Sequence, residues 1–247
     1  MRKDFEVRWE GELPGVPLHV WDAITMRSDG YLWPIAYEPW VGGAETGLTG
    51  GGAVTRWEPS RHFTTRAEDG DGFNELDYIL EPRGAGTYLR YVHRGVLAEE
   101  TYELELDACR QHTAFYLHSL GEYVGHFSGR EPLYVSADGP EASAVAGSGV
   151  VRRALGLAEN VAVGDRVRLT PAGIEPIEGV VDYLTPAFLG VRSVDALYRV
   201  YGRDVWGWPV SVAHHLFAGG VNSTDKPAAE QAWGAWLDGV FAARAVG

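Results

Sequence analysis

WPIAYEPWVGGAETGLTGGGAVTRWEPSRHF, residues 33–63, is the stretch of sequence that decides the fold. Six glycines lie within residues 42–52, and the tryptophans Trp33, Trp40 and Trp57 flank them. Glycine at this density allows tight turns and positive φ, while large indole rings need an apolar surface to cover. The stretch therefore predicts tight turns at the mouth of a concavity that aromatic side chains line.

The residues before this stretch predict one strand and one short helix. Phe5, Val7 and Trp9 alternate with other residues, most of them charged, so they share one face of a strand. Near Pro17 the apolar residues change to helical spacing, and proline suits the first turn of a helix. The chain thus opens with a half-buried strand and an amphipathic helix.

The residues after this stretch predict a meander of strands and then a long helix. Turns rich in Gly, Pro and Asp separate four alternating segments, which predicts antiparallel strands at 54–57, 61–67, 73–80 and 87–94. In residues 107–127 apolar side chains recur every three or four positions, which predicts an amphipathic helix with Asp107 as a candidate N-cap. Such a helix needs an apolar sheet face to lie on, and the preceding strands supply one.

The second half repeats this order of elements in a looser and shorter form. It predicts a strand at 133–137, a helix near 151–157, strands within 167–217 and a closing helix around Trp233 and Trp236. The small residues of 140–149 are typical of a linker or junction. A chain of 247 residues has room for two small domains, and we predict them at 1–130 and 131–247.

Composition limits the partners and the location that we expect. The formal net charge of −13 disfavours nucleic acid, because an acidic surface repels phosphate backbones. The single cysteine, Cys109, excludes an intrachain disulfide and a multi-cysteine zinc site. The opening residues lack a secretion signal, and no apolar run approaches the roughly 20 residues that span a membrane. We therefore expect a cytoplasmic protein without a membrane span.

Several short motifs follow one another in the order found in a known superfamily. They are Val20-Trp21-Asp22-Ala23-Ile24, Trp33, Gly42-Gly43, Trp57-Glu58-Pro59-Ser60-Arg61, Gly86-Thr87 opening a strand that ends His93-Arg94-Gly95, and the closing helix. On these marks residues 1–130 resemble the SRPBCC superfamily (START-like, birch-pollen-allergen-like), in the branch of homologues of the heat-shock-protein ATPase activator. For residues 131–247 the resemblance rests on the internal repeat.

The resemblance implies an α+β helix-grip fold, in which a curved antiparallel sheet wraps around a long C-terminal helix. It also implies a hydrophobic cavity between sheet and helix for an apolar or amphipathic ligand. Members of the superfamily include lipid carriers, plant-hormone binders, polyketide aromatases and cyclases, and chaperone-ATPase stimulators. We expect two tandem modules here, the second a shortened and degenerate copy.

The candidate ligand-binding residues are aromatic and apolar side chains of the first half, with two polar ones among them: Trp33, Trp40, Trp57, Phe63, Tyr78, Leu89, Arg90, Tyr91, His93, Tyr116 and Leu120. Each alone is better explained as part of an ordinary core, and only together do they favour a pocket. His93 shares a strand face with Tyr91, whereas Arg90 has the opposite parity and would be the polar anchor if the faces were reversed.

Neither metal chemistry nor a known catalytic motif emerges from the residues. His118, Glu122 and His126 have a spacing that could hold a metal, but a solvated helix face explains them, so we predict no metal and no other cofactor. His214 and His215 are adjacent on a predicted strand and should point to opposite faces. No nucleophile elbow, phosphate-binding loop or dinucleotide fingerprint occurs.

Three functions remain open. The favoured one is a non-catalytic protein that binds a small apolar or amphipathic molecule. An enzyme of the polyketide aromatase/cyclase or dehydratase kind would need convergent polar groups, for which Arg90 or His93 with Tyr91 are the candidates. A co-chaperone that stimulates the ATPase of a protein partner is the third. Ligand identity and oligomeric state do not follow from the sequence.

Overall fold

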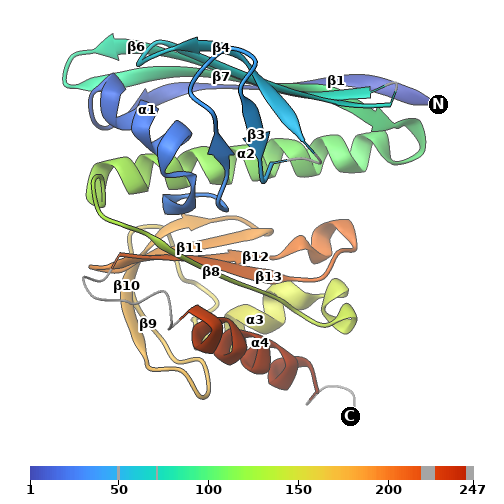
Figure 1. Ribbon diagram of the computed structural model, residues 1–247. Coiled ribbons are helices and arrows are strands. Elements are labelled where there is room, and N and C mark those ends of the chain that lie inside the picture. Colours follow the sequence, from blue (N-terminus) through green and yellow to red (C-terminus); the bar gives the residue numbers. More distant parts are fainter. Residues whose placement is uncertain (49–50, 71, 218–225, 243–247) are drawn as a thin grey trace. The chain divides into compact units, whose positions relative to one another are not determined.

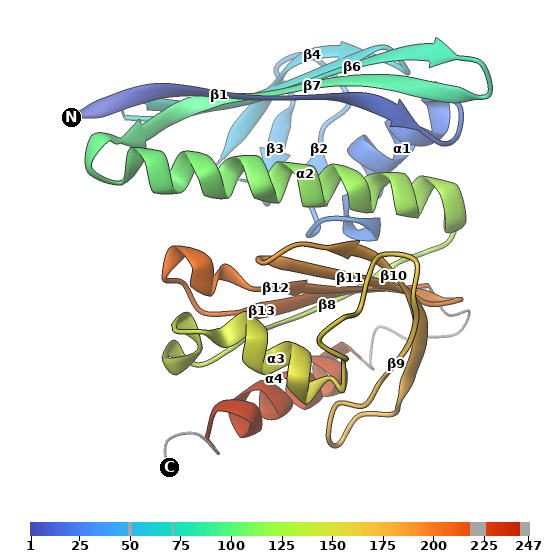
Figure 2. The same ribbon diagram turned by 180° about the vertical axis from the view of Figure 1, so that it is seen from behind.

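The computed structural model describes residues 1–48, 51–70, 72–217 and 226–242 (Figures 1 and 2). The chain divides into two compact units, Met1–Arg130 (unit 1) and Glu131–Gly247 (unit 2). Each unit is α+β and contains one antiparallel sheet. Among the helices of the described residues, none combines the length and the apolar character needed to cross a membrane.

Unit 1 has the predicted helix-grip fold. Figures 1 and 2 show its long helix α2 running along one side of the sheet, with α1 beside it at one end. The sheet order is β1-β7-β6-β5-β4-β3-β2, so the first strand pairs with the last. In chain order the elements are β1 (Arg2–Leu13), α1 (Pro17–Met26), η1 (Ser28–Gly30), β2 (Ala36–Tyr37), β3 (Ala44–Thr46), β4 (Gly52–Glu58), β5 (His62–Asp69), β6 (Gly72–Arg83), β7 (Gly86–Ala98), η2 (Glu99–Thr101) and α2 (Tyr102–His126).

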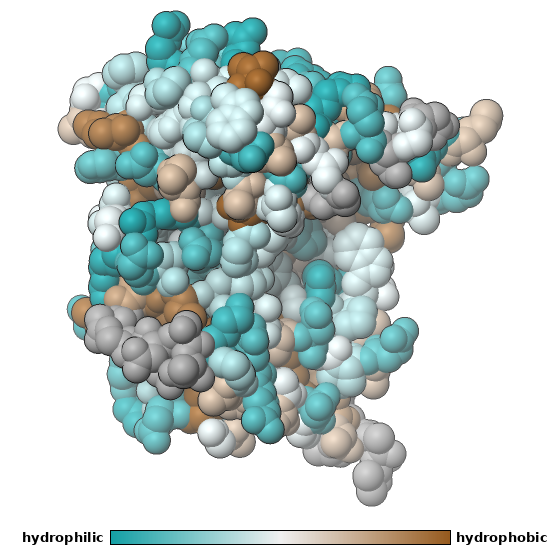
Figure 3. Space-filling model, viewed as in Figure 1, coloured by the Kyte–Doolittle hydropathy of each residue, from teal (hydrophilic) through white to brown (hydrophobic). Residues whose placement is uncertain are grey.

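Alternation of apolar and charged residues fixes the register of the central strands. Phe5 and Val7 of β1 are buried on the inner face, and Val7 lies opposite His93 of β7. On the outer face Arg94 bridges two neighbouring strands, with its Nε 2.8 Å from Glu6 and its Nη1 3.0 Å from Glu75. A slip of one residue would exchange the two faces, so the pattern excludes such a slip. Figure 3 shows a mainly hydrophilic surface above this sheet.

The turn between β4 and β5 contains a strained residue. The Arg61 backbone N–H donates to the Glu58 carbonyl at 2.9 Å, with Pro59 at the second position of the turn. Ser60, at the third position, has a φ of 60°. Glycine is usual where a turn needs positive φ, because a Cβ is disfavoured there. Ser60 therefore has a strained backbone, because its Cβ disfavours this positive φ.

Helix α2 begins five residues before the predicted start. Its first residue is Tyr102, and η2 leads directly into it. Asp107 is therefore not the N-cap; it lies inside the helix and accepts a hydrogen bond from Gln111 Nε2 at 2.9 Å. Acidic residues favour the first turn of a helix because they interact well with its dipole, and Glu103 and Glu105 lie there. The buried Leu106 then packs against Phe5 and Val7 and anchors the added turn.

Unit 2 has the same strand connectivity as unit 1, with one strand fewer in its described sheet. Its sheet order is β8-β13-β12-β11-β10-β9, so its first strand again pairs with its last. This topology confirms the predicted tandem layout. The elements are β8 (Leu133–Asp138), η3 (Glu141–Ala144), α3 (Gly147–Ala154), β9 (Arg166–Leu169), β10 (Ile177–Leu184), β11 (Phe188–Arg192), β12 (Ala196–Tyr201), η4 (Arg203–Trp206), β13 (Ser211–Leu216) and α4 (Lys226–Ala242).

The segment 140–149 is not a linker, and that prediction is wrong. It forms η3 and the start of α3 inside unit 2. Ser143 Oγ accepts a hydrogen bond from the Val210 backbone N–H at 3.1 Å and donates to the Pro140 carbonyl at 2.6 Å. A Cβ on Gly147 would lie 2.6 Å from a Val210 methyl group. The small residues reflect close packing rather than chain mobility.

Candidate ligand-binding site

A continuous row of aromatic rings covers the inner face of unit 1. The ring centroids of Trp21 and Trp57 are 4.9 Å apart, and those of Trp57 and Phe63 are 5.7 Å apart. Tyr78 follows at 5.8 Å from Phe63, and Tyr91 at 4.8 Å from Tyr78. The structure thus brings together four of the candidate residues, and Trp21 of α1 joins them.

Two further tyrosines that the sequence reasoning missed belong to this row. Tyr31 is buried and forms a side-chain hydrogen bond with Tyr78, which in turn bonds to Tyr91. The Tyr37 ring lies 4.7 Å from Phe63. Burial raises the pKa of all four phenols, so they stay protonated at neutral pH. Tyr31 lies in a turn and Tyr37 in the two-residue strand β2, both too short to show periodicity, and their nearness to Trp33 was the one available signal.

Trp33 connects the glycine-rich segment to the long helix. Its indole Nε1–H donates to the Gly47 carbonyl at 2.7 Å, and its ring lies 5.7 Å from Tyr116 of α2. Leu89 of β7 and Leu120 of α2 are fully buried. Leu89 lies on the inner face of the sheet, and Tyr116 and Leu120 lie on α2. Trp33 lies in the segment between η1 and β2.

Trp40 and Arg90 lie elsewhere, which corrects two of the candidate assignments. Trp40 is 52% exposed in the loop between β2 and β3. Arg90 lies on the outer face of β7, where it forms an ion pair with Glu81 of β6. Tyr91 and His93 have the inner-face parity, so the faces are not reversed and Arg90 is no anchor for an interior ligand.

A cavity of about 500 Å³ lies at one end of the inner face. Its lining combines residues of β1, β5, β6 and β7 with one residue of α2, and it includes Phe5, Ala67, Asn74, His93, Leu97 and Cys109. Two charged residues, Arg2 of β1 and Glu68 of β5, also line it. Of the candidates, only His93 lines this cavity. Asn74 and Cys109 were not foreseen as lining residues, although Asn74 has the same parity along β6 as the buried Leu76 and Tyr78.

Two titratable groups of this wall, His93 and Cys109, are uncharged at neutral pH. His93 Nε2 lies 2.6 Å from Asn74 Oδ1, and the Phe5 ring meets the imidazole edge-on at 4.9 Å. Burial lowers the pKa of His93 to about 4, so the ring is neutral at pH 7. Burial, reinforced by Glu105, raises the pKa of Cys109 to about 11, so the thiol is also neutral. The cavity thus combines neutral polar groups with two charged residues, Arg2 and Glu68.

Gly95 of β7 makes room for the Phe5 ring in this wall. The two residues face each other in the register of β1 and β7. A Cβ built on Gly95 would lie 2.7 Å from Phe5 Cε1 and 2.8 Å from the Phe73 carbonyl oxygen. Contacts this short are not tolerated, so only glycine allows the ring to cover this position.

A surface groove of about 650 Å³ lies at the other end of the sheet, between the start of α1, the β4–β5 turn and the end of β6. Leu18 and Pro82 contribute apolar surface to it, and Glu58, Arg61 and Glu81 contribute opposite charges. None of the candidate residues lines this groove.

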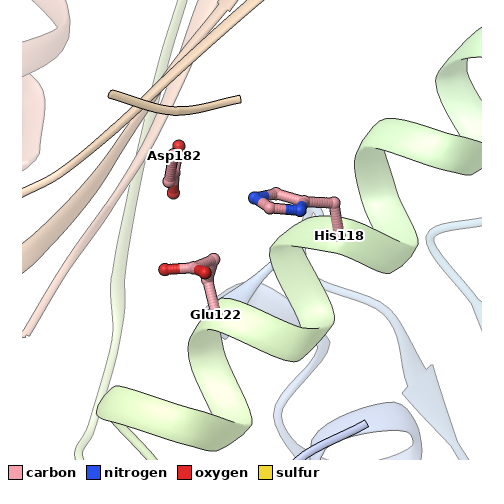
Figure 4. Close-up of side chains that lie close together, drawn as sticks. All are labelled: His118, Glu122 and Asp182. Atoms are coloured by element: carbon pink, nitrogen blue, oxygen red, sulfur yellow. The ribbon is translucent and has the colours of Figure 1, made fainter. Parts of the chain in front are cut away.

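The polar face of α2 carries the residues considered for a metal. Figure 4 shows His118 and Glu122 on successive turns of the helix. Glu122 Oε2 lies 3.7 Å from His126 Nε2, so the two side chains are neighbours at the i,i+4 spacing of a helix. Asp182, also labelled in Figure 4, belongs to β10 of unit 2 and is described with that unit.

Several buried polar groups of unit 2 have structural partners. Arg199 forms a two-pronged ion pair with Asp182, at 3.0 and 2.9 Å. A Cβ on Gly190, in the strand between them, would collide with the Asp182 carboxylate. His214 Nδ1 accepts a hydrogen bond from the Arg199 backbone N–H at 3.1 Å, and its ring lies 4.3 Å from Trp233.

His214 and His215 point to opposite faces, as predicted, since the His215 ring lies 5.6 Å from Tyr134 instead. Burial lowers the pKa of His214 to about 3. Between sheet and α4, a single cluster of buried apolar residues includes Trp233, Trp236 and Leu237.

Comparison with known proteins identifies similar structures but no family. No family model matches the chain, and no curated protein matches it in sequence. CalU16 from Micromonospora echinospora is 20% identical, over 50% of this chain and 86% of that one, with a TM-score of 0.39. The Aha1 dimer from Colwellia psychrerythraea is 17% identical, over 51% of this chain and 99% of that one, with a TM-score of 0.42. At these values no function transfers, and the fold rests on the strand order and helix placement described above.

Proposed function

We propose that unit 1 is a non-catalytic binding module that holds a small apolar or amphipathic molecule between its sheet and α2. The supporting observation is the cavity of about 500 Å³, whose inner wall joins apolar side chains to the neutral His93, Asn74 and Cys109. Ligand sites commonly have this size and this mixture of apolar surface with a few placed polar groups. Unit 2 is proposed as a degenerate second module that accompanies unit 1, because its apolar cluster and its Arg199–Asp182 ion pair stabilise its own interior.

Two measurements on the full chain test this function. The first is mass spectrometry of small molecules that denaturation releases from the natively purified protein. The second is fluorescence titration with Nile red, an uncharged apolar dye. Ala67→Trp places an indole in the cavity wall and is expected to abolish dye binding. Ala85→Trp, in the exposed β6–β7 turn, is the matched control and is expected to bind as the wild type does. Equal binding by both variants, or no binding by the wild type together with no released molecule, would exclude the proposal.

An enzyme of the aromatase, cyclase or dehydratase kind is the second candidate. One observation favours it: His93 and Tyr91 share the inner face of β7, and His93 lines the cavity. Turnover of a linear polyketide thioester analogue by the wild type, lost in His93→Phe, would support this function. A wild type that leaves every such substrate unchanged would remove it.

The cytoplasmic location and a protein partner also belong to this proposal. A co-chaperone role predicts that the purified chain raises the rate of a heat-shock-protein ATPase. A titration that leaves the rate flat would discard that role without affecting ligand binding.

A further inference from the structure

The surface groove of about 650 Å³ in unit 1 contains one charge without a partner. Of its two carboxylates, Glu58 pairs with Arg56 at 3.3 Å, and Glu81 pairs with Arg90. The guanidinium of Arg61, in the same groove, makes neither an ion pair nor a hydrogen bond within the described residues. The groove therefore presents a positive charge that its own carboxylates do not neutralise.

The β4–β5 turn holds Arg61 in a fixed position beside a second donor. The Arg61 N–H donates to the Glu58 carbonyl at 2.9 Å, and its carbonyl accepts from the Leu80 N–H at 2.8 Å. Ser60, which has the strained φ of 60°, also lines the groove, and its hydroxyl makes no hydrogen bond to any residue that the structure describes. Backbone strain of this kind is common at ligand-binding positions. A hydroxyl and a guanidinium both donate, so a carboxylate could accept from the two neighbours.

The rest of the groove is apolar and open to solvent. Val16 and Leu18, at the start of α1, are 45% and 54% exposed, and Pro82 of β6 is exposed opposite them. Sites for small molecules usually enclose most of the ligand, whereas these side chains stay about half exposed. An extended peptide can lie along such a surface. The net charge of −13 repels a strongly acidic chain, so one carboxylate among apolar side chains fits best.

We propose that this groove docks an extended segment of a protein partner, in which a single glutamate or aspartate lies between aliphatic residues. The carboxylate pairs with Arg61 and accepts a hydrogen bond from the Ser60 hydroxyl. The aliphatic side chains of the segment cover Val16 and Leu18. The groove and the cavity share no lining residue, so this inference is independent of the proposed ligand binding.

Titration of the isotope-labelled full chain with capped pentapeptides, followed by nuclear magnetic resonance, tests the proposal. The probes have the sequence alanine-leucine-X-leucine-alanine, with glutamate, glutamine or lysine at X. Acetyl and amide caps remove the terminal charges, so the central residue alone sets the charge. The glutamate peptide is expected to shift the amide signals of Leu18 and Arg61. It should bind about fivefold more tightly than the glutamine peptide, near the upper end for an exposed ion pair, and the lysine peptide should bind least.

Four variants separate the contributions to binding. Arg61→Gln is expected to bring the glutamate and glutamine peptides within about twofold of each other. Arg166→Gln, at an exposed arginine of β9 in unit 2, is the matched control and should keep the wild-type order. Leu18→Ala should weaken the glutamate and glutamine peptides by the same factor, because it removes apolar contact only. Ser60→Gly should weaken the glutamate peptide while the protein stays fully folded, since glycine relieves the strain of the turn.

Several results would overturn the inference. One is equal binding of the glutamate and glutamine peptides by the wild type, or no shift with either. Another is a preference that persists in Arg61→Gln. Binding of 4-methylpentanoate, a small aliphatic acid, as tightly as the glutamate peptide would assign the groove to small molecules instead of a protein partner. Nile red binding in the cavity should be the same in Arg61→Gln as in the wild type, so none of these results affects the proposed function.

Discussion

Replacing Gly95 by alanine tests how the cavity wall is built. The added Cβ would lie 2.7 Å from Phe5 Cε1 and 2.8 Å from the Phe73 carbonyl oxygen. Phe5 is 7% exposed and packs with Val7 and Leu106, so its ring has little space to move into. Overpacking of this kind costs about 1–3 kcal/mol, and we expect Gly95→Ala to lower the free energy of unfolding by about 2 kcal/mol.

A double-mutant cycle identifies the group responsible for this loss. Phe5→Leu removes the outer ring atoms, so Gly95→Ala in that background should cost about 1 kcal/mol less, and the Phe73 carbonyl accounts for the remainder. Urea denaturation of the four full-length proteins, followed by circular dichroism, gives each free energy. Gly121→Ala is the control, because its Cβ would have its nearest contact at 3.5 Å, in a helix where alanine is favoured. A coupling below about 0.5 kcal/mol would show that Gly95 does not accommodate Phe5.

Three further predictions concern stability. Ser60→Gly should raise the free energy of unfolding by about 1 kcal/mol in urea titrations, because glycine adopts a φ of 60° without opposition from a Cβ. Gly239→Ala should raise it by up to about 1 kcal/mol, since alanine favours the helix and its Cβ would meet nothing within 4 Å. Burial holds the pKa of His93 near 4, below its ordinary 6.5, so the unfolded chain binds the proton first as pH falls. Stability should therefore be full above pH 6.5 and decline from pH 6.5 to 4, and His93→Phe should reduce that decline.

Each of these predictions has a result that contradicts it. A Ser60→Gly variant as stable as the wild type would mean that the turn relaxes in solution. A destabilised Gly239→Ala variant would indicate an unseen contact on that side of α4. A His93→Phe variant with the wild-type decline would assign the acid sensitivity to another group, of which His214 is the next candidate, because burial lowers its pKa to about 3.

The fold of unit 1 could be predicted because strand periodicity and burial agree there. The alternation of Leu89 and Tyr91 with Arg90 separates the two faces of β7, and the burial of Leu89 and Tyr91 shows which face is the inner one. The start of α2 could not be placed, because the acidic residues before Asp107 read equally well as a solvated loop. Their helical state depends on the contact of Leu106 with Phe5, a residue just over 100 positions earlier in the chain.

The candidate site was predicted less completely than the fold. Tyr31 and Tyr37 lie outside any periodic segment, so their place in the aromatic row depends on tertiary packing. The parity of Asn74 along β6 was its one signal, and a single amide on a strand is ordinary until its partner His93 is found 2.6 Å away. Trp40 looked like a pocket residue by type alone, although its surroundings leave it in solvent.

The pairing of first strand with last in both sheets has a consequence for synthesis on the ribosome. At translation rates of about 5–20 residues per second, β1 leaves the exit tunnel several seconds before β7 exists to receive it. The nascent N-terminal segment must wait as an unpaired strand, and its alternating charges keep it from joining a neighbouring chain in the meantime.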